Sequence, residues 1–427
     1  MASKKNNAGF AFILVTSLFF LWGFAHNLDP ILIPHLKKSF TLTTTEATLV
    51  DSAVFIAYFL MAIPAGFVMK KYGYKIGIIA GLLLFAAGSF LFIPAANTQS
   101  YYFFLIALFI IACGLTFLET AANPYAAVLG PAESSTQRLN LAQSFNGLAA
   151  AIAPVIGARI ILTKGYSETD LASMSNEVRK IALASEASSV KLPYFILGAV
   201  LVLIAIIFSF TKLPKIEHTE GKEKSKSILH AFRHQHLTWA VVAQFFYVGA
   251  QVSVFSLFIL YATKSAAITE LKAADFLGAC GIAFLIGRFL GTFLMKFIKP
   301  NKLLAIYAAF NILLCAVAIL ASGMITVYTV VLICFFMSIM FPTIFALGIK
   351  NLGNDTEYGS SLIIMSIVGG AILPRIFGYI SDSTNNIQLG YIVPLVCFIV
   401  ISYYGFRGYK VVDKAVIDED KIVCAIS

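Results

Sequence analysis

Long apolar stretches recur along the whole chain, and only short polar segments separate them. A membrane-spanning helix uses about 20 mostly apolar residues, and twelve stretches are long enough. Because lipid offers no hydrogen-bond partner to an irregular backbone, each stretch is predicted to be a helix. The sequence therefore predicts an all-α integral membrane protein with twelve transmembrane helices. The predicted spans are residues 9–36, 46–69, 76–96, 101–127, 138–163, 192–212, 238–263, 273–297, 303–322, 326–349, 358–381 and 388–407.

Composition excludes most other classes of protein. Of the 427 residues, 59% are hydrophobic and 12% are charged, whereas soluble domains have about 45–50% apolar and about 25% charged residues. Too few charges remain to cover a water-facing surface, which excludes a soluble enzyme, a nucleic-acid-binding protein and a disordered chain. The apolar run that starts at Phe10 is too long for a signal peptide, so it is interpreted as the first span.

The positive charges predict the orientation in the membrane. The net charge is +10, and membrane proteins concentrate Lys and Arg in their cytoplasmic loops. With the N-terminus inside, the cytoplasmic segments hold more than twice as many Lys and Arg residues as the outer segments. Both termini are therefore expected in the cytoplasm, with the chain crossing the cell's inner membrane many times.

The longest cytoplasmic segment divides the chain near its middle. Residues 214–236 are basic and are interpreted as a linker between two bundles of six helices. The N-terminal bundle is predicted to be residues 1–213 and the C-terminal bundle residues 237–408, followed by a cytoplasmic tail, 409–427. The other long loop, 164–190, lies outside and is predicted to contain a short surface helix.

Two short motifs recur in corresponding spans of the two halves. Gly66–Lys71 is similar to Gly291–Lys296, and Asn123–Gly130 is similar to Phe341–Gly348. Such internal repeats are typical of secondary transporters, in which the substrate binds between the repeats near the middle of the membrane.

Glu119 is a carboxylic acid well inside the fourth span. An ionisable group in a membrane span is costly and is a functional candidate by default. A carboxyl group in such a place can bind and release a proton as its surroundings change. Asn123 lies four residues later, on the same helix face. The alternative is a protonated glutamic acid that only bridges two helices.

Gln143 and Asn146 lie three residues apart on one face of the fifth span. Glu119 and Asn146 are each eight residues from the inner ends of their predicted spans, which places both about 12 Å deep. Amide groups both donate and accept hydrogen bonds, which suits the hydroxyl groups of a sugar. The alternative is that these amides bridge helices.

The first and seventh spans carry further polar candidates. His26, Asn27 and Asp29 precede Pro30, which interrupts a helix. Asp29 is therefore a second candidate for a proton or cation, or a cap of the broken helix. In the seventh span, the amides and the phenol of one helical stripe suit a sugar's hydroxyls and its apolar ring face. That stripe is Gln244, Tyr247 and Gln251.

Other chemistry finds no support in the sequence. The six cysteines have no metal-binding spacing and no disulfide pattern. No phosphate-binding loop and no hydrolase motif is present, so ATP-driven transport and membrane enzymes are disfavoured. Arg288 is interpreted as a residue that snorkels or pairs at the inner face. We expect no cofactor and no metal, with a proton as the coupling ion and sodium as the alternative.

The chain resembles the L-fucose/proton symporters and their glucose–galactose relatives, in the major facilitator superfamily. The similarity runs through nearly all twelve spans, and it is most specific at residues 118–124, 138–143, 247–251 and 341–353. The resemblance implies two six-helix bundles that transport a monosaccharide by alternating access. We expect a monomer in lipid that binds no nucleic acid.

The resemblance further implies a proton or substrate role for Glu119 and sugar contacts for Asn27, Gln143 and Asn146. The acid of span one departs from the family pattern: Asp29 comes one residue early, about 100° around a regular helix. Phe255 replaces an expected tryptophan, which leaves the sugar preference open.

Lys70 stands where the superfamily usually has an aspartate. Two functions remain beside proton-coupled sugar uptake. One is sodium-coupled transport of a hexose or an amino sugar. The other is a sugar sensor, which would need a larger cytoplasmic extension than residues 409–427.

Overall fold

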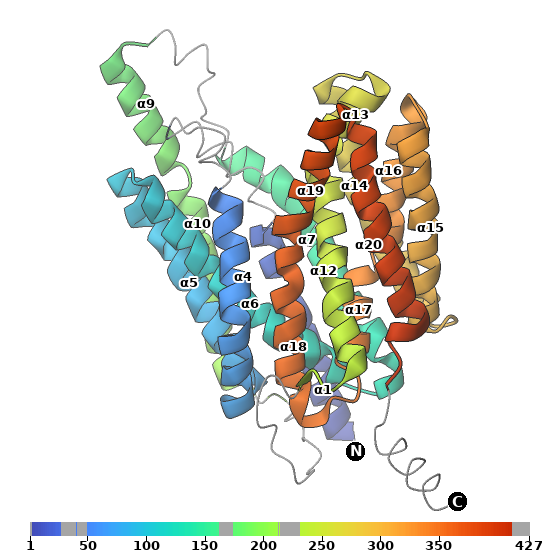
Figure 1. Ribbon diagram of the computed structural model, residues 1–427. Helices are drawn as coiled ribbons and strands as arrows, with labels where there is room; N and C mark the ends of the chain where they lie inside the picture. The colour runs from blue at the N-terminus through green and yellow to red at the C-terminus, as the bar shows by residue number, and fades with distance from the viewer. Residues whose placement is uncertain are drawn as a thin grey trace, which may run out of the picture.

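Long helices, most of them roughly parallel to one axis, form the body of the protein (Figure 1). The structure is a computed structural model that describes residues 2–26, 40, 49–161, 174–211, 213 and 231–411. Within these residues, ten helical segments are long and apolar enough to cross a membrane. The first helix begins and the last helical turn ends at the same end of the bundle, which we call the inner end. The opposite end is the outer end.

In the described residues of the N-terminal half there are six long helices and two short ones. Polar side chains such as Asn140, Gln143 and Asn146 occupy the first half of α7. The short helix α9 lies at the outer end, within the loop that is predicted to contain a surface helix. The elements are α1 (Ala2–His26), α4 (Leu49–Tyr72), α5 (Tyr74–Thr98), α6 (Tyr101–Val128), η1 (Ala132–Ser134), α7 (Ser135–Ile161), α9 (Asn176–Ser188) and α10 (Lys191–Phe210).

The C-terminal half repeats this arrangement with more interruptions. Its helices are α12 (Gln235–Ser256), α13 (Phe258–Ala266), α14 (Glu270–Leu294), α15 (Pro300–Leu320), α16 (Met324–Met337), α17 (Met340–Gly348), α18 (Thr356–Met365), α19 (Gly369–Thr384) and α20 (Ile392–Tyr403). Short 3₁₀ or π turns join them: η2 (Gly353–Asp355), η3 (Ser366–Val368), η4 (Ile387–Tyr391) and η5 (Tyr404–Gly408).

Three spans that the sequence predicts as continuous helices are interrupted. The seventh breaks at Leu257, the tenth at Ser338–Ile339 and the eleventh at the 3₁₀ turn Ser366–Val368. The length of an apolar run in the sequence does not reveal these breaks, because the residues at each break are small or as apolar as their neighbours. Broken helices free backbone carbonyl groups inside the bundle, where such groups can bind a ligand or a side chain.

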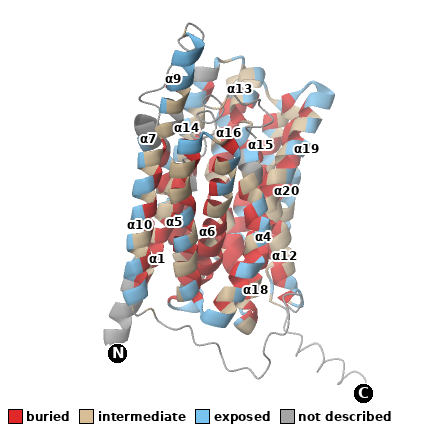
Figure 2. Ribbon diagram, turned by 90° about the vertical axis from the view of Figure 1, so that its left-hand side faces the viewer, coloured by how far each residue is buried: buried red, intermediate tan, exposed pale blue. Residues whose placement is uncertain are grey.

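Buried residues gather toward the middle of the helix bundle and exposed residues toward its outside (Figure 2). Many of the exposed residues are large and apolar. Phe210 and Leu320 are each 85% exposed, which would be unfavourable in water and is expected of a surface that faces lipid. The arrangement agrees with the all-α membrane class that the sequence predicts.

Gly114 lies where α5 and α6 approach each other closely. A Cβ atom there would lie 2.5 Å from the backbone nitrogen of Phe85 and 2.7 Å from the carbonyl oxygen of Gly81. Small residues permit such contacts between membrane helices. We therefore expect Gly114→Val to lower the free energy of unfolding by about 3 kcal/mol through overpacking.

The measurement is thermal unfolding of the purified protein in detergent. Gly278→Ala is the matched control, because a Cβ on this exposed glycine of α14 would meet no atom within 4 Å. The control should unfold at the parent's temperature or slightly above it. Equal melting temperatures for Gly114→Val and the parent would contradict the packing argument.

Candidate functional site

Glu119 lies in α6, nine residues before the inner end of that helix, or about 14 Å along its axis. Its neighbours Leu118, Thr120 and Asn123 are buried, whereas Glu119 itself is only partly buried. Its Oε1 accepts a hydrogen bond of 2.5 Å from the hydroxyl of Tyr58 on α4. A carboxyl group that is deep in a span and also reachable by solvent is suited to exchange a proton.

The amides near Glu119 form a continuous row. Asn123 donates from Nδ2 to the backbone carbonyl of Glu119 at 2.8 Å, and Gln143 donates from Nε2 to Oδ1 of Asn123 at 3.0 Å. The second bond joins α6 to α7. The bond therefore brings Asn123 and Gln143, both of which are buried, to the same level of the two helices. The predicted common depth of Glu119 and Asn146 stays a prediction.

Asn146 lies farther along α7 and is partly exposed. Its side chain packs against Gly23 of α1, where a Cβ atom would lie 2.9 Å from the Asn146 amide. Only glycine permits this approach of α1 to α7. Asn146 therefore lies on the same helix as Gln143 and contacts the first span at Gly23.

The stripe on α12 is mostly covered in this structure. Gln244 and Tyr247 are both 0% exposed, and only Gln251 is partly exposed. The Tyr247 ring lies edge-on to Phe341, with 6.2 Å between centroids. In this conformation α17 covers Tyr247, so the stripe is not open along its whole length.

Gln244 and Tyr247 nevertheless have unused polar atoms. Within the described part of the chain, neither the Gln244 amide nor the Tyr247 hydroxyl has a hydrogen-bond partner. Buried polar groups without partners are rare and call for an explanation such as a ligand or water.

Arg288 does not reach the surface at the inner end of α14, although the sequence suggests that it snorkels or pairs there. It lies in α14, is 3% exposed and contacts both halves of the protein. Its Nη1 donates to the carbonyl of Gln143, and its Nε donates to the carbonyl of Ser338, each at 2.8 Å. The interrupted tenth helix makes the Ser338 carbonyl available, which the sequence alone does not reveal.

The two halves also meet at the inner end. Asn140 on α7 donates to the Thr343 hydroxyl on α17 at 3.2 Å, and Gln137 donates to the Thr292 carbonyl on α14 at 3.3 Å. Beside these contacts, the Lys70 amine lies 4.3 Å from the centre of the Tyr358 ring on α18. These contacts close the inner end of the space between the halves.

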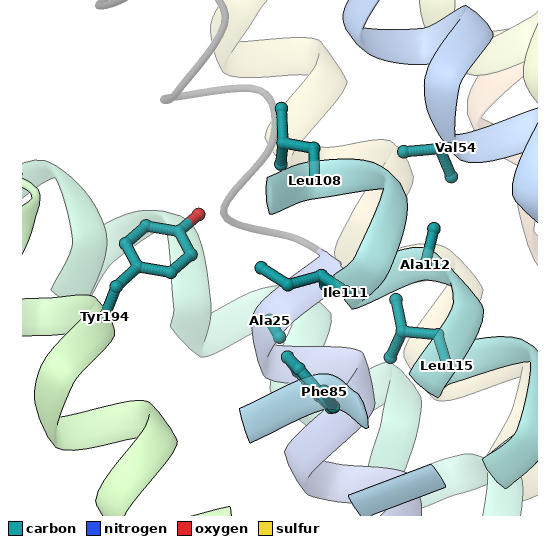
Figure 3. Close-up of a pocket in the computed structure, with 8 residues that line it drawn as sticks. All are labelled: Ala25, Val54, Phe85, Leu108, Ile111, Ala112, Leu115 and Tyr194. Carbon is teal, nitrogen blue, oxygen red and sulfur yellow. The ribbon is translucent and has the colours of Figure 1, made fainter. Parts of the chain in front are cut away.

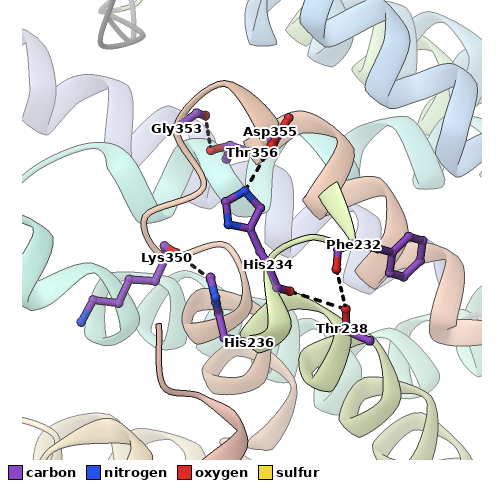
Figure 4. Close-up of polar contacts among 8 residues, drawn as sticks. All are labelled: Phe232, His234, His236, Thr238, Lys350, Gly353, Asp355 and Thr356. Atoms are coloured by element: carbon purple, nitrogen blue, oxygen red, sulfur yellow. Dashed lines mark hydrogen bonds and ion pairs between the residues drawn. The ribbon is translucent and has the colours of Figure 1, made fainter. Parts of the chain in front are cut away.

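Polar contacts also fix the start of the C-terminal half (Figure 4). His234 lies 3.2 Å from the Asp355 carboxylate, and His236 lies 2.8 Å from the carbonyl of Lys350. These contacts hold the inner end of α12 against the segment before α18.

Several predicted residues cannot be placed. Asn27, Asp29 and Pro30, and the side chain of His26, lie outside the described residues, so the roles of Asn27 and Asp29 stay predictions. Among the described residues, no group of three or more His, Cys, Asp or Glu side chains could hold a metal ion.

An apolar pocket lies within the N-terminal half, between α1, α4, α5, α6 and α10 (Figure 3). The Tyr194 hydroxyl is the single side-chain polar group among its lining residues. It contains none of the predicted sugar or proton residues. We therefore place the candidate site in the amide row beside Glu119 and at the contact between the halves.

Comparisons with known proteins agree with this architecture. Residues 10–373 match the Major Facilitator Superfamily. The chain belongs to this superfamily and is a multi-pass integral membrane transporter, not an enzyme.

The chain is 46% identical to the L-fucose-proton symporter of Escherichia coli (strain K12), covering 93% of each protein. It is 39% identical to the glucose/galactose transporter of Brucella abortus, covering 96% of each. A crystal structure of a Major Facilitator Superfamily transporter, FucP, in the outward conformation aligns with a TM-score of 0.88 and 43% identity. That alignment covers 94% of this chain and 99% of the other.

Proposed function

We propose that this protein is a proton-coupled symporter that carries a monosaccharide of the L-fucose, galactose or glucose type into the cell by alternating access. The similarity to an L-fucose-proton symporter and to a glucose/galactose transporter supports this substrate class. No cofactor takes part, and the proton gradient supplies the driving force.

Glu119 is the observation that carries the proposal. It is a carboxyl group about 14 Å into α6, it keeps some exposure to solvent, and it is bonded to Tyr58. The amide row of Asn123 and Gln143 begins at its own backbone carbonyl. Glu119 and Asn123 lie about one turn apart on α6, and Gln143 of α7 is bonded to Asn123. Binding of a proton to Glu119 can therefore alter binding of a sugar to these amides. Asp29 is proposed as a second proton group.

The sugar contacts are assigned to both halves. Asn27, Asn123, Gln143 and Asn146 supply amides from the N-terminal half, and Gln244, Tyr247 and Gln251 supply polar groups from α12. The unused polar atoms of Gln244 and Tyr247 would gain partners when a sugar binds and the helices adjust.

The halves, residues 1–213 and 237–408, are proposed to rock against each other, with residues 214–236 as the linker and 409–427 as a tail. The inner-end contacts of Lys70, Gln137 and Asn140 hold the closed side. We propose that the inner end faces the cytoplasm, that the protein is a monomer in the lipid of the inner membrane, and that both termini are cytoplasmic.

The test is uptake of labelled monosaccharides into vesicles that contain the purified protein. A proton gradient and a sodium gradient are imposed separately, each in the absence of the other. Accumulation of a hexose or 6-deoxyhexose driven by protons supports the proposal. Accumulation driven by sodium alone would show that the coupling ion is sodium and not the proton. No accumulation of any sugar would overturn the proposal.

Three amides give a direct test of the sugar site. Loss of a hydrogen bond that leaves a buried group unpaired costs about 1–3 kcal/mol. We therefore expect Gln143→Ala, Asn146→Ala and Gln251→Ala each to raise the sugar dissociation constant about ten-fold. The measurement is calorimetry on folded protein. Unchanged affinity in all three variants would exclude these residues as ligands.

A further inference from the structure

Arg288 is a buried cation that the proposed transport steps do not use. Among the described residues, no carboxylate forms an ion pair with it. Burial of an unpaired charge is costly, and an arginine cannot discard its charge. The face of the guanidinium instead lies 4.5 Å from the centre of the Phe284 ring. A costly charge in the middle of a transporter is a functional candidate.

The two carbonyl groups that Arg288 binds belong to different halves. Gln143 is on α7 in the N-terminal half, and Ser338 is at the break between α16 and α17 in the C-terminal half. Arg288 also lies near enough to Tyr247 for an electrostatic interaction. One guanidinium group therefore joins the amide row beside Glu119 to the interrupted helix and to the α12 stripe.

We propose that Arg288 is a positioning residue for the sugar, which fixes Gln143 from the opposite half of the protein. This inference rests on the proposed sugar transport. The bond to the Gln143 carbonyl holds that part of the α7 backbone, while the Gln143 side chain is held by Asn123. An amide that is already oriented loses less conformational freedom when a sugar binds, so its contribution to affinity is larger.

The position of Arg288 makes sugar affinity depend on conformation. Arg288 and Gln143 are on different halves, so separation of the halves at the inner end breaks their bond. Gln143 then loses its support in the state from which sugar leaves to the cytoplasm. The site therefore binds sugar more tightly with the inner end closed than with it open, which favours release inward.

The test measures sugar binding in one fixed conformation, so that a shift between conformations cannot contribute. Gln137 and Thr292 are in contact across the halves at the inner end. In a Cys424→Ser background, cysteines at these two positions are joined with a short bis-maleimide, which locks the inner end closed. Calorimetry then gives the dissociation constant of the sugar that the parent transports.

In the locked protein, Arg288→Lys should weaken sugar binding about five-fold, because a lysine amine cannot hold both carbonyl groups in the planar fork of arginine. Arg288→Gln should weaken it at least as much. The lysine variant keeps the charge and serves if the glutamine variant does not fold. An equal dissociation constant for locked Arg288→Lys and the locked parent would overturn the inference.

A double-mutant cycle separates positioning from general support of the fold. If Arg288 acts through Gln143, then Arg288→Lys should have almost no further effect in a Gln143→Ala background. A purely structural residue would weaken binding by the same factor in both backgrounds, and that result would also overturn the inference. A locked parent that binds no monosaccharide would instead refute the proposed function itself.

Discussion

Glu119→Gln should abolish uphill accumulation of sugar while leaving exchange of sugar between the two sides of the membrane. The glutamine keeps the size of the side chain and can still accept a hydrogen bond from Tyr58, which the parent receives at 2.5 Å. It cannot bind and release a proton. The variant therefore keeps its sugar site and its ability to change conformation, but it loses the group that couples transport to the proton gradient.

The measurement compares proton-driven uptake with exchange of labelled sugar at equal concentrations on both sides. Glu133→Gln is the matched control, since Glu133 is exposed on η1 between α6 and α7. The control should behave like the parent in both assays. Full accumulation by Glu119→Gln would remove Glu119 from coupling and leave Asp29 as the remaining candidate.

The sequence predicted the spans well because hydropathy depends only on local composition. Long apolar runs must be helices in lipid, and each predicted span in the described residues contains one or more helices. The interruptions at Leu257 and Ser338 were missed, because neither is a proline and each break depends on packing between helices. The polar carbonyl that Ser338 offers to Arg288 was therefore also missed.

The candidate site was predicted in part for a similar reason. Polar residues inside apolar runs stand out, which is how Glu119, Asn123 and Gln143 were found. Tyr58 was not, because a tyrosine in a membrane span usually indicates packing, and its partner is 61 residues away in the sequence. Arg288 stood out as a charge, but its distance from the membrane surface depends on how α14 packs against α7.

Lys70, which departs from the family pattern, contacts the other half of the protein. The residue lies at the inner end of α4 against the Tyr358 ring of α18, 4.3 Å from its centre. Asp355 and Glu357, both buried at the start of α18, interact electrostatically with Lys70. Tyr74 at the start of α5 interacts with Glu357 as well. A cation on one half therefore lies beside two acids on the other.

Lys70→Glu should favour opening of the inner end, because it places a third carboxylate beside Asp355 and Glu357. Lys70 is partly exposed, so screening by solvent limits the change in the free energy of opening to about 1 kcal/mol for each lost or reversed charge pair. Two such pairs predict a shift of about 2 kcal/mol, or about thirty-fold in the ratio of open to closed states. Uptake from outside should fall accordingly.

Opening is measured by labelling a cysteine at Thr343, which is buried against Asn140 in the closed inner end. A water-soluble maleimide is added to inside-out vesicles. If the inner end opens and closes faster than the cysteine reacts, the labelling rate follows the open fraction and should rise about thirty-fold in Lys70→Glu. Lys71→Glu is the matched control, because Lys71 is exposed and lies over Tyr72 of its own helix. Equal labelling rates in both variants would mean that Lys70 carries no cross-half interaction and that amide contacts such as Gln137–Thr292 hold the inner end closed without it.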